Sequence, residues 1–545
     1  MKKILGAAIG SCVHVAGLLN FLKLAENEGY KTIYLGGAVD LDKLVGAIIE
    51  SDPDIIAISY RLDPKALEKL LEELEKKLKN NNLLNKIFVF GGTVETGSVA
   101  RKFNFITKVF DGTQEIEEVV LWLRNAEVKK ENFEIPPQTL PERIKYKSPF
   151  PLIRHHIGLP TLEETEKNIE ILSDSGLLDI ISLAPDQNCQ QYFFEPEKMD
   201  KKQDGAGGAP IRTIEDFKRL YNASRRGNYP LMRSYSGTRN LVKFSKILKE
   251  TINNAWAAIP LTWYSDLDRR SDRDLLNAIK ENQEAIKWNA MNNVPVEINE
   301  AHQWSLRYAH DAMEVATFYL AAYNAKKLGV KHYVAQYMLT TPPGLSPKFD
   351  LAKQLAKKEL IETLHDDNFI SYTMIRTGLL SFPADEYSAM GQLVSTMFYG
   401  MYLRPDILHV VSYSEAIRRA TSKEIIESVK MVKQAMRNAM TGLPDFLSDK
   451  EIRNRIEKLK NEAMIIIEAI KELGRDFEDP LVEPEVIYNA VKFGILDAPG
   501  LKGMSVARAR FDTRIINGAC YAVDEEGKIL SEEKRIEIIR KEAGI

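Results

Sequence analysis

A histidine with small and polar neighbours stands near the start of the sequence, in the run Ile9-Gly10-Ser11-Cys12-Val13-His14-Val15-Ala16-Gly17. The apolar residues from Ile4 to Ile9 predict a strand before it, and apolar residues recur at helical spacing from Val15 to Leu22 after it. His14 is therefore expected on a strand-to-helix loop at the carboxyl edge of an α/β sheet, where open sheets bind their ligands. An imidazole there could ligate a metal; the alternative is a partly buried surface histidine without a ligand.

Two further loops with ligand-binding residue types follow strands of the same predicted sheet. Ser59 follows the apolar run 54–58, and Gly91-Gly92-Thr93 follows the run 87–90. Glycines let a backbone approach a ligand closely, while serine and threonine offer hydroxyls. Strand-like and helix-like segments alternate from Lys2 to Asn125. This alternation predicts a doubly wound parallel sheet of flavodoxin-like (Rossmann-like) type.

His14, Gly17, Ser59, Gly91 and Gly92 together resemble the cobalamin-binding domain of B12-dependent mutases and methionine synthases. In that family a D-x-H-x-x-G loop supplies the lower axial histidine of cobalt, and the serine and glycine loops line the nucleotide tail. The resemblance implies that His14 is the metal ligand. The motif's aspartate falls on Cys12, a weak hydrogen-bond acceptor. The alternative is a flavodoxin-like sheet whose loop happens to contain a histidine. The expected cofactor-binding residues of this domain are Ser11, Cys12, Val13, His14, Gly17, Ser59, Gly91, Gly92 and Thr93.

A second set of apolar runs follows a proline-rich stretch, and helical segments lie between the runs. Eight such runs with intervening helices predict a (β/α)8 TIM barrel, although Pro260 and Pro295 interrupt the fourth and fifth. Chemistry is expected at the carboxyl ends of these strands. The runs are 151–154, 179–183, 229–233, 256–261, 294–298, 331–336, 369–375 and 407–412, and the residues that end them include Arg154, Arg233, Glu297, His302 and Arg376.

The predicted organisation is a cobalamin-binding domain over residues 1–126, a linker over 127–150 and a barrel over 151–480. A carboxyl-terminal extension over 481–545 is expected to pack on the barrel. The linker prediction rests on its prolines, which stiffen a chain into an extended spacer.

The barrel region resembles the barrel subunit of glutamate mutase, through stretches such as Pro230-Leu231-Met232-Arg233, 382–386, Ser414-Glu415-Ala416 and 493–499. The resemblance implies that Arg154 and Arg233 bind substrate carboxylates and that Glu415 contacts the adenosyl group. Gln190 stands where the family has a second arginine, and Ala255 falls near the position of the glutamate that receives the substrate ammonium. Gln190 and Tyr235 are expected to shape specificity. In that family the cobalamin domain is a separate subunit, whereas here both regions lie in one chain.

These resemblances imply an adenosylcobalamin-dependent carbon-skeleton mutase, an isomerase that uses radical chemistry on a small amino or carboxylic acid. The cofactor carries the radical chemistry, and the protein positions and encloses it. The substrate stays open, since Gln190 and Ala255 depart from the pattern for glutamate. A homodimer is implied by the same resemblance. Two alternatives remain, a corrinoid-dependent methyltransferase and a cobalamin-binding sensor without catalysis.

The composition excludes several other classes of protein. A net charge of −3, with 28% charged and 44% apolar residues, favours neither nucleic acid nor a membrane surface as a partner. The three cysteines are widely spaced, which fits a reducing cytoplasm, and no apolar run is long enough to span a bilayer. Residues 1–12 also resemble a lipoprotein export signal, which is the alternative to a cytoplasmic location.

Overall fold

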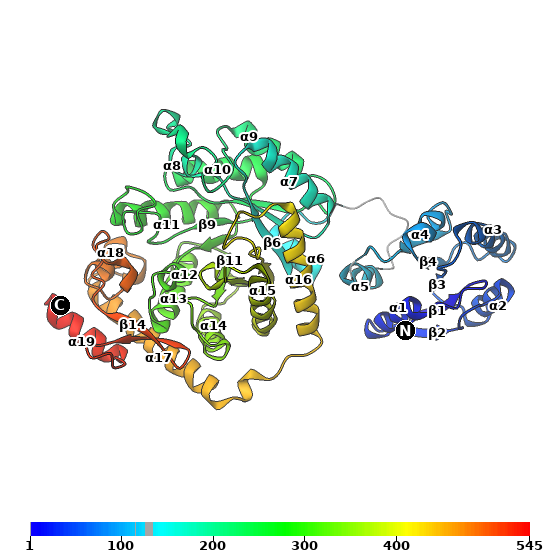
Figure 1. Ribbon diagram of the computed structural model, residues 1–545. Coiled ribbons are helices and arrows are strands. Elements are labelled where there is room, and N and C mark those ends of the chain that lie inside the picture. The colour runs from blue at the N-terminus through cyan, green and yellow to red at the C-terminus, as the bar shows by residue number, and fades with distance from the viewer. Residues whose placement is uncertain (1, 115, 126–134, 545) are drawn as a thin grey trace. The chain divides into compact units, whose positions relative to one another are not determined.

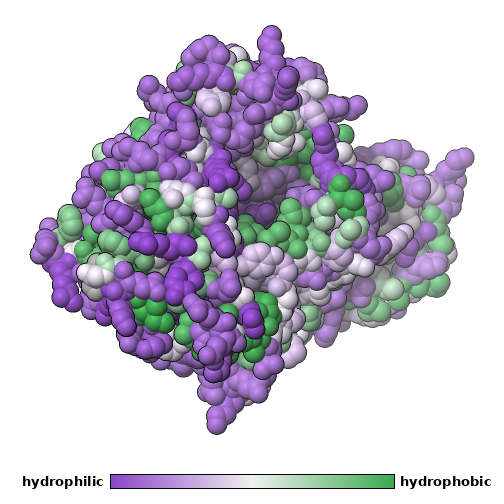
Figure 2. All heavy atoms as spheres, turned by 60° about the vertical axis from the view of Figure 1, so that its left-hand side comes forward, coloured by the Kyte–Doolittle hydropathy of each residue, from purple (hydrophilic) through white to green (hydrophobic). Residues whose placement is uncertain are grey.

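The computed structural model describes residues 2–114, 116–125 and 135–544. The chain forms two compact units, Met1–Glu134 and Ile135–Ile545 (Figure 1). Most of the surface seen in Figure 2 is hydrophilic, with hydrophobic residues in scattered groups. Among the described residues, no helix combines the length and the apolar character that crossing a membrane requires.

The amino-terminal unit is a five-stranded parallel sheet with strand order β2-β1-β3-β4-β5. Alternate residues along each strand face opposite sides, so Leu5 and Ile56 pack against α2, α3 and α4, while Ile4 and Ile55 pack against α1 and α5. The predicted flavodoxin-like fold is confirmed. Its elements are β1 (Lys3–Ala8), α1 (Ala16–Asn27), β2 (Lys31–Tyr34), α2 (Leu41–Ser51), β3 (Ile55–Ser59), α3 (Pro64–Asn80), β4 (Ile87–Gly91), α4 (Val94–Ala100), β5 (Ile106–Phe110) and α5 (Ile116–Asn125).

The second unit contains an eight-stranded parallel barrel with helices around it, which confirms the predicted (β/α)8 architecture (Figure 1). Each of the eight predicted apolar runs contains part or all of one strand. The strands are β6 (Leu152–Ile157), β7 (Ile180–Leu183), β8 (Leu231–Ser234), β9 (Ala257–Ile259), β10 (Val296–Ile298), β11 (His332–Leu339), β12 (Ile370–Thr377) and β13 (Ile407–His409).

Helices connect the barrel strands and extend beyond the last of them. They are α7 (Leu162–Asp174), α8 (Gln187–Tyr192), α9 (Ile214–Ala223), α10 (Leu241–Ile252), α11 (Leu275–Met291), α12 (Ala301–Ser305), α13 (Asp311–Lys327), α14 (Pro347–Glu362), α15 (Glu386–Gly400), α16 (Ser422–Met440), α17 (Lys450–Leu473), α18 (Pro484–Lys492) and α19 (Glu532–Ala543).

Seven of the eight neighbouring strand pairs are hydrogen-bonded as strands, β10 and β11 through the single pair Val296–Tyr333, and the eighth pair, β8 and β9, is not. These two strands are joined by an isolated bridge between Tyr235 and Ala258 and by the hydrogen bond from Ala255 N to Met232 O at 2.8 Å. The three residues of β9 end at Pro260, and the three residues of β10 begin after Pro295, since proline has no N–H to donate to a ladder. Pro260 thus ends one short strand and Pro295 precedes another. The barrel is nearly closed.

A helix, α6 (Leu140–Lys147), lies where the sequence predicted an extended linker. Leu140 and Ile144 are one helical turn apart, and both pack against the apolar residues that open the barrel strands, such as Leu152 and Leu231. This apolar contact explains why the segment is helical despite its prolines. Residues 127–134 of the predicted linker lie outside the described residues.

The carboxyl-terminal segments pack on the outer helices of the barrel unit. A hairpin of β14 (Asp512–Ile516) and β15 (Ala519–Val523) is fixed by the hydrogen bond from Cys520 N to Asp311 Oδ2 at 3.1 Å. Helix α19 is fixed by Glu532, whose carboxylate lies 2.6 Å from Nε2 of His310 and 2.9 Å from Nε of Arg535. All of these polar contacts are buried, so the hairpin and the last helix belong to the same compact body as the barrel.

Candidate functional site

The histidine loop of the amino-terminal unit joins β1 to α1, as the sequence predicts. Cys12 is buried and His14 is exposed, and the Cys12 sulfur lies 4.0 Å from Nδ1 of the imidazole. The loop is fixed from the next connection by the hydrogen bond from Ala38 N to Cys12 O at 2.8 Å. The neighbouring Val13 is 66% exposed. The imidazole is therefore presented to an external ligand by an anchored backbone.

The three ligand-binding loops of this unit meet at one edge of the sheet. Ala8, the last residue of β1, pairs with Ser59, the last residue of β3, and Ser59 pairs with Gly91, the last residue of β4. Because these strands are parallel and adjacent, the residues after them share the carboxyl edge. The structure thus brings the loops of His14, Ser59 and Gly91 side by side.

The two adjacent glycines of the third loop have different surroundings. A Cβ built on Gly91 would meet nothing within 4 Å, whereas one on Gly92 would lie 2.3 Å from Thr96 Oγ1 and 2.8 Å from Tyr60 O. Gly92 is thus required by the packing of the loop, while Gly91 leaves open space. Thr93 caps α4 through a reciprocal pair of contacts with Thr96. Gly17, in the first turn of α1, also borders open space.

These features fit a corrinoid. The imidazole of His14 is exposed, and the edge beside it has open space at Gly91 and Gly17 where side chains would otherwise project. Among the described residues, no group of three or more His, Cys, Asp and Glu side chains could hold a metal ion. A single protein ligand is sufficient for a metal that a macrocycle already holds. His14 would be that ligand, and the loops at Ser59 and Gly91 would line the rest of the cofactor.

A cavity of about 540 Å³ lies in the barrel unit. Arg154, Arg233, Tyr235 and Glu415, four of the five residues predicted for this region, line it. Both polar and apolar side chains line the cavity. The polar lining also includes His156, Tyr264, Arg270, Glu297, Asn299, His302, Gln303, Gln336, Arg376 and His409, and the apolar lining includes Leu306, Met338, Leu379, Leu380 and Phe382.

Gln190 does not line this cavity. Its Nε2 donates to Pro185 O at 2.8 Å, and its backbone oxygen accepts from Thr238 N at 2.8 Å. The side chain is thereby used to shape the connection after β7. Gln190 stands where the glutamate mutase family has its second arginine. The structure does not place it with Arg154 and Arg233 at the cavity.

Arg154 is 1% exposed and lies on β6 with its guanidinium among protein acceptors. Nε donates to Ser182 Oγ at 2.7 Å, Nη2 donates to His156 Nε2 at 2.8 Å and Nη1 lies 3.1 Å from Met374 Sδ. The guanidinium also lies over the ring of Trp256, at 5.1 Å from its centroid. The arginine is therefore fixed in one position.

A chain of hydrogen bonds runs from Arg154 across the cavity wall. Since arginine only donates, His156 accepts at Nε2 and carries its proton on Nδ1, which faces His409 Nε2 at 3.2 Å. Nδ1 of His409 lies 3.3 Å from Arg154 Nη1 and 3.4 Å from Gln336 Oε1, and Gln336 Nε2 lies 3.2 Å from His302 Nδ1. The arrangement assigns one tautomer to His156.

Both histidines are neutral in this environment. Burial, followed by the charges of Arg154, Arg233 and Arg376, holds the pKa of His156 well below its ordinary value. Burial and the charges of Arg154 and Arg376 lower the pKa of His409 in the same way. Neither residue is among the site residues predicted from the sequence. The two-residue spacing of Arg154 and His156, which places them on one face of β6, was the available signal for His156.

Arg233 and Tyr235 occupy another side of the cavity. The Arg233 guanidinium lies 5.2 Å from the ring centroids of both Tyr235 and Trp256, and Tyr235 stacks on His156 at 5.2 Å. Trp256 Nε1 donates to Glu297 Oε2 at 2.7 Å. A carboxylate and two arginines thus flank one indole, which gives the cavity groups for both an anion and a cation.

Glu415 follows the last barrel strand and pairs with a histidine outside the predicted set. Its Oε1 lies 3.2 Å from Nε2 of His155 and accepts from Ser412 N at 3.0 Å. Burial acts to raise the pKa of Glu415, but the hydrogen bond and charge of His155 outweigh it, and the pKa is lowered. Glu415 is therefore an ionised group at the edge of the cavity.

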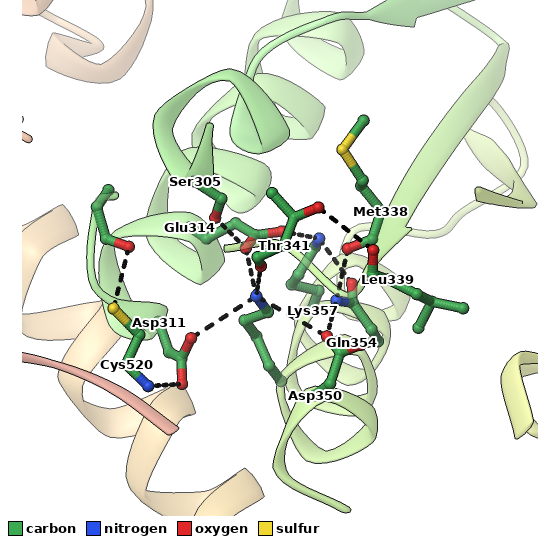
Figure 3. A network of polar contacts seen from close by, with 12 residues as sticks. Ser305, Asp311, Glu314, Met338, Leu339, Thr341, Asp350, Gln354, Lys357 and Cys520 are labelled. Atoms are coloured by element: carbon green, nitrogen blue, oxygen red, sulfur yellow. Dashed lines mark hydrogen bonds and ion pairs between the residues drawn. The ribbon is translucent and has the colours of Figure 1, made fainter. Parts of the chain in front are cut away.

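A buried network of charges supports the wall that α12 and β11 contribute (Figure 3). Glu314 is fully buried and binds Lys353 Nζ at 2.7 Å and Lys357 Nζ at 2.6 Å, and it also accepts from the Ser305 hydroxyl of α12. Lys353 Nζ donates to Thr341 O at 2.6 Å, just after β11. Because His302 and Met338 lie on these two elements, the network fixes one side of the cavity from behind.

The model of the B12 binding domain family matches residues 2–119. No curated protein matches the chain. A cobalamin-binding protein from Desulfitobacterium hafniense DCB-2 is 24% identical over 20% of this chain and 52% of its own, with a TM-score of 0.18, so the chain spans about half the length of that protein. The domain match shows that the amino-terminal unit is a B12-binding domain.

Two structures of the cobalamin-dependent S-adenosylmethionine radical enzyme OxsB were also found. The apo form is 12% identical over 100% of this chain and 80% of its own, with a TM-score of 0.20. The form with aqua-cobalamin and S-adenosylmethionine bound is 12% identical over 90% and 70%, with a TM-score of 0.22. TM-scores of this size carry no argument about fold or activity.

Proposed function

We propose that this chain is an adenosylcobalamin-dependent carbon-skeleton mutase that acts on a small amino or carboxylic acid. The observation that supports the proposal is the presence, in one chain, of a B12-binding domain and a barrel with an arginine-lined cavity. Adenosylcobalamin, when bound, supplies a cobalt–carbon bond whose homolysis starts radical chemistry.

The residues of this chain have distinct tasks under the proposal. His14 ligates cobalt, and the loops at Ser59 and Gly91 hold the nucleotide tail. In the barrel, the arginines orient an anionic substrate, because a guanidinium matches the planar geometry of a carboxylate. The ionised Glu415 accepts hydrogen bonds from hydroxyl groups of the adenosyl moiety.

Enclosure of the reacting groups is the second task of the barrel. The apolar residues that line the cavity, Leu306, Leu379, Leu380 and Phe382, exclude water from a bound substrate. The aromatic rings of Tyr235 and Trp256 restrict the orientation of Arg233 and therefore of the anion that it binds. The proposal includes a homodimer, which light scattering on the purified chain would test.

The test is incubation of the full chain with adenosylcobalamin and a panel of amino and carboxylic acids. Binding is followed in the visible spectrum, cob(II)alamin by electron paramagnetic resonance, and rearranged product by NMR. A substrate-dependent cob(II)alamin signal with a rearranged product is expected. Failure to bind adenosylcobalamin would refute the proposal. Methyl transfer from methylcobalamin would identify a corrinoid methyltransferase instead, and light-stable binding without hydrogen exchange into any acid would identify a sensor.

A further inference from the structure

The arginines of the barrel cavity differ in how many of their N–H groups are already used. A guanidinium has five N–H groups, and those of Arg154 are directed at Ser182 Oγ, Met374 Sδ and His156 Nε2. Its Nη1 also lies 3.3 Å from Nδ1 of His409, so the two N–H groups of Nη1 face two neighbouring atoms, Met374 Sδ and His409 Nδ1. Arg154 therefore has only one N–H group, on Nη2, that is not directed at a neighbouring atom, whereas a bidentate contact with a carboxylate needs two.

Arg233 is in the opposite situation. It is 1% exposed, yet its Nε has no hydrogen-bond partner, and the contact that its Nη2 makes with Ser234 O is long, at 3.4 Å. A buried charged donor without a partner is costly and requires an explanation. Because Arg233 lines the cavity, an anion bound there could accept hydrogen bonds from its free N–H groups.

Arg376, on β12, also has guanidinium N–H groups without a protein partner. Within the described part of the chain it makes neither a hydrogen bond nor an ion pair, and its Nε is buried without a partner. In the order β8-β7-β6-β13-β12-β11-β10-β9, strands β8 and β12 are four positions apart, so Arg233 and Arg376 belong to opposite sides of the barrel. Both line the same cavity.

We propose that Arg233 and Arg376 bind the two anionic ends of the ligand of this cavity, and that Arg154 is a positioning residue. The ligand is a small acid with two separated carboxylates. Arg154 keeps His156 in one tautomer, contacts His409 and adds positive charge behind the site. This inference rests on the proposed function only in treating the barrel cavity as the substrate site.

The test measures binding to the cobalamin-free full chain, so that its outcome does not depend on cofactor chemistry. Isothermal titration calorimetry is carried out with succinate, glutarate and adipate, and with the monoamide of the tightest of them, which has nearly the same size but one charge fewer. The wild-type protein is expected to prefer the dicarboxylate by about 10- to 100-fold, the value of a charge-assisted hydrogen bond.

Arg376→Gln is expected to remove that preference while the monoamide binds as before. It breaks no hydrogen bond or ion pair within the described chain, so the variant should fold, which its circular dichroism and melting curve would check. Arg475→Gln, a surface substitution on a side chain 75% exposed, serves as the matched control and should change neither affinity. Arg233→Gln is expected to weaken both ligands.

Arg154→Lys separates the positioning role from direct binding. Lysine retains the charge but cannot contact Ser182 and His156 at once, so both affinities should fall while the preference for the dicarboxylate persists. Loss of the preference in Arg154→Lys, its retention in Arg376→Gln, or failure of all three dicarboxylates to bind the wild type would each overturn the proposal. Dicarboxylate binding without any rearrangement activity would contradict the proposed function and leave this inference standing.

Discussion

The sulfur of Cys12 lies 4.0 Å from Nδ1 of His14, at the position where a hydrogen-bond acceptor would orient the imidazole. A carboxylate there would fix the tautomer and increase the basicity of the ligating nitrogen. A thiol is a weaker acceptor, and this one is buried, so it orients the ring chiefly by contact.

Replacing His14 by Ala should weaken cobalamin binding much more than replacing Cys12 by Ala, because only the first change removes a cobalt ligand. The measurement is titration with cobalamin followed in the visible spectrum. In protein with ¹⁵N-labelled histidine, electron paramagnetic resonance of bound cob(II)alamin should show splitting by a ¹⁵N nucleus in Cys12→Ala and none in His14→Ala. If both variants bound cobalamin equally well, ligation by His14 would be the wrong interpretation.

The adjacent glycines Gly91 and Gly92 form a matched pair for a steric test. Gly92→Ala should lower the melting temperature of the amino-terminal unit, because the new Cβ would overlap Thr96 Oγ1 and the backbone oxygen of Tyr60. Gly91→Ala should leave the melting temperature unchanged and reduce cobalamin affinity, because its Cβ enters open space at the cofactor edge. The prediction is contradicted if Gly91→Ala binds cobalamin as tightly as the wild type does.

The buried carboxylate of Glu314 should contribute strongly to the stability of the barrel unit. Glu314→Gln leaves Lys353 and Lys357 without their shared anion, and removal of one partner from a buried ion pair costs about 3–5 kcal/mol. Calorimetric unfolding would measure the loss. The control is Glu163→Gln, which breaks an exposed pair with Arg219 and should cost about 1 kcal/mol or less. Equal effects of the two substitutions would show that the network adds little.

The same carboxylate should make the folded protein less stable as the pH falls. Burial acts to raise the pKa of Glu314, but the charges of Lys353 and Lys357 lower it to about 2. A depressed pKa stabilises the folded state above the unfolded value of about 4.3, and this stabilisation is lost as the pH falls towards 2. Glu314→Gln should therefore show a flatter loss of stability over this range than the wild type.

The neutral histidines of the cavity should also make the stability of the folded protein depend on pH, in a higher range than Glu314 does. Because the pKa values of His156 and His409 are lowered in the folded state, the unfolded chain binds more protons below about pH 6.5, and stability falls with the pH. Each histidine contributes at most about 1.4 kcal/mol per pH unit. His156→Gln, whose amide oxygen still accepts from Arg154, should reduce the slope between pH 6.5 and 5. An unchanged slope would mean that His156 is protonated in the folded protein.

The sequence predicts both architectures because their signals are local. The alternation of apolar runs and helices is visible in single segments, and even the short strands beside Pro260 and Pro295 lie within the predicted runs. Helix α6 was missed because its apolar residues, Leu140 and Ile144, are stabilised by contact with strands distant in sequence. The loops of His14, Ser59 and Gly91 were identified from the known geometry of parallel sheets.

The barrel cavity could be predicted only in part. Arg154 and Arg233 were singled out, but the sequence does not reveal which of their N–H groups the folded chain already uses. His156 and His409 are part of the cavity wall because β6 and β13 are neighbouring strands and the two rings contact each other. Residues close to each histidine in the sequence do not indicate this pairing. Gln190 was placed by alignment with a family, and the fold directs its side chain to Pro185 instead.

The incomplete ladder between β8 and β9 affects how the barrel would respond to a ligand. Across this seam the backbone contributes little, whereas the side chains of Arg233 on β8 and Trp256 just before β9 are in contact. A ligand held by Arg233 on β8 and by Glu297 on β10 would span the seam and link the strands on its two sides. Occupancy of the cavity and rigidity of the barrel are then coupled, so hydrogen exchange at β8 and β9 would slow when the ligand binds.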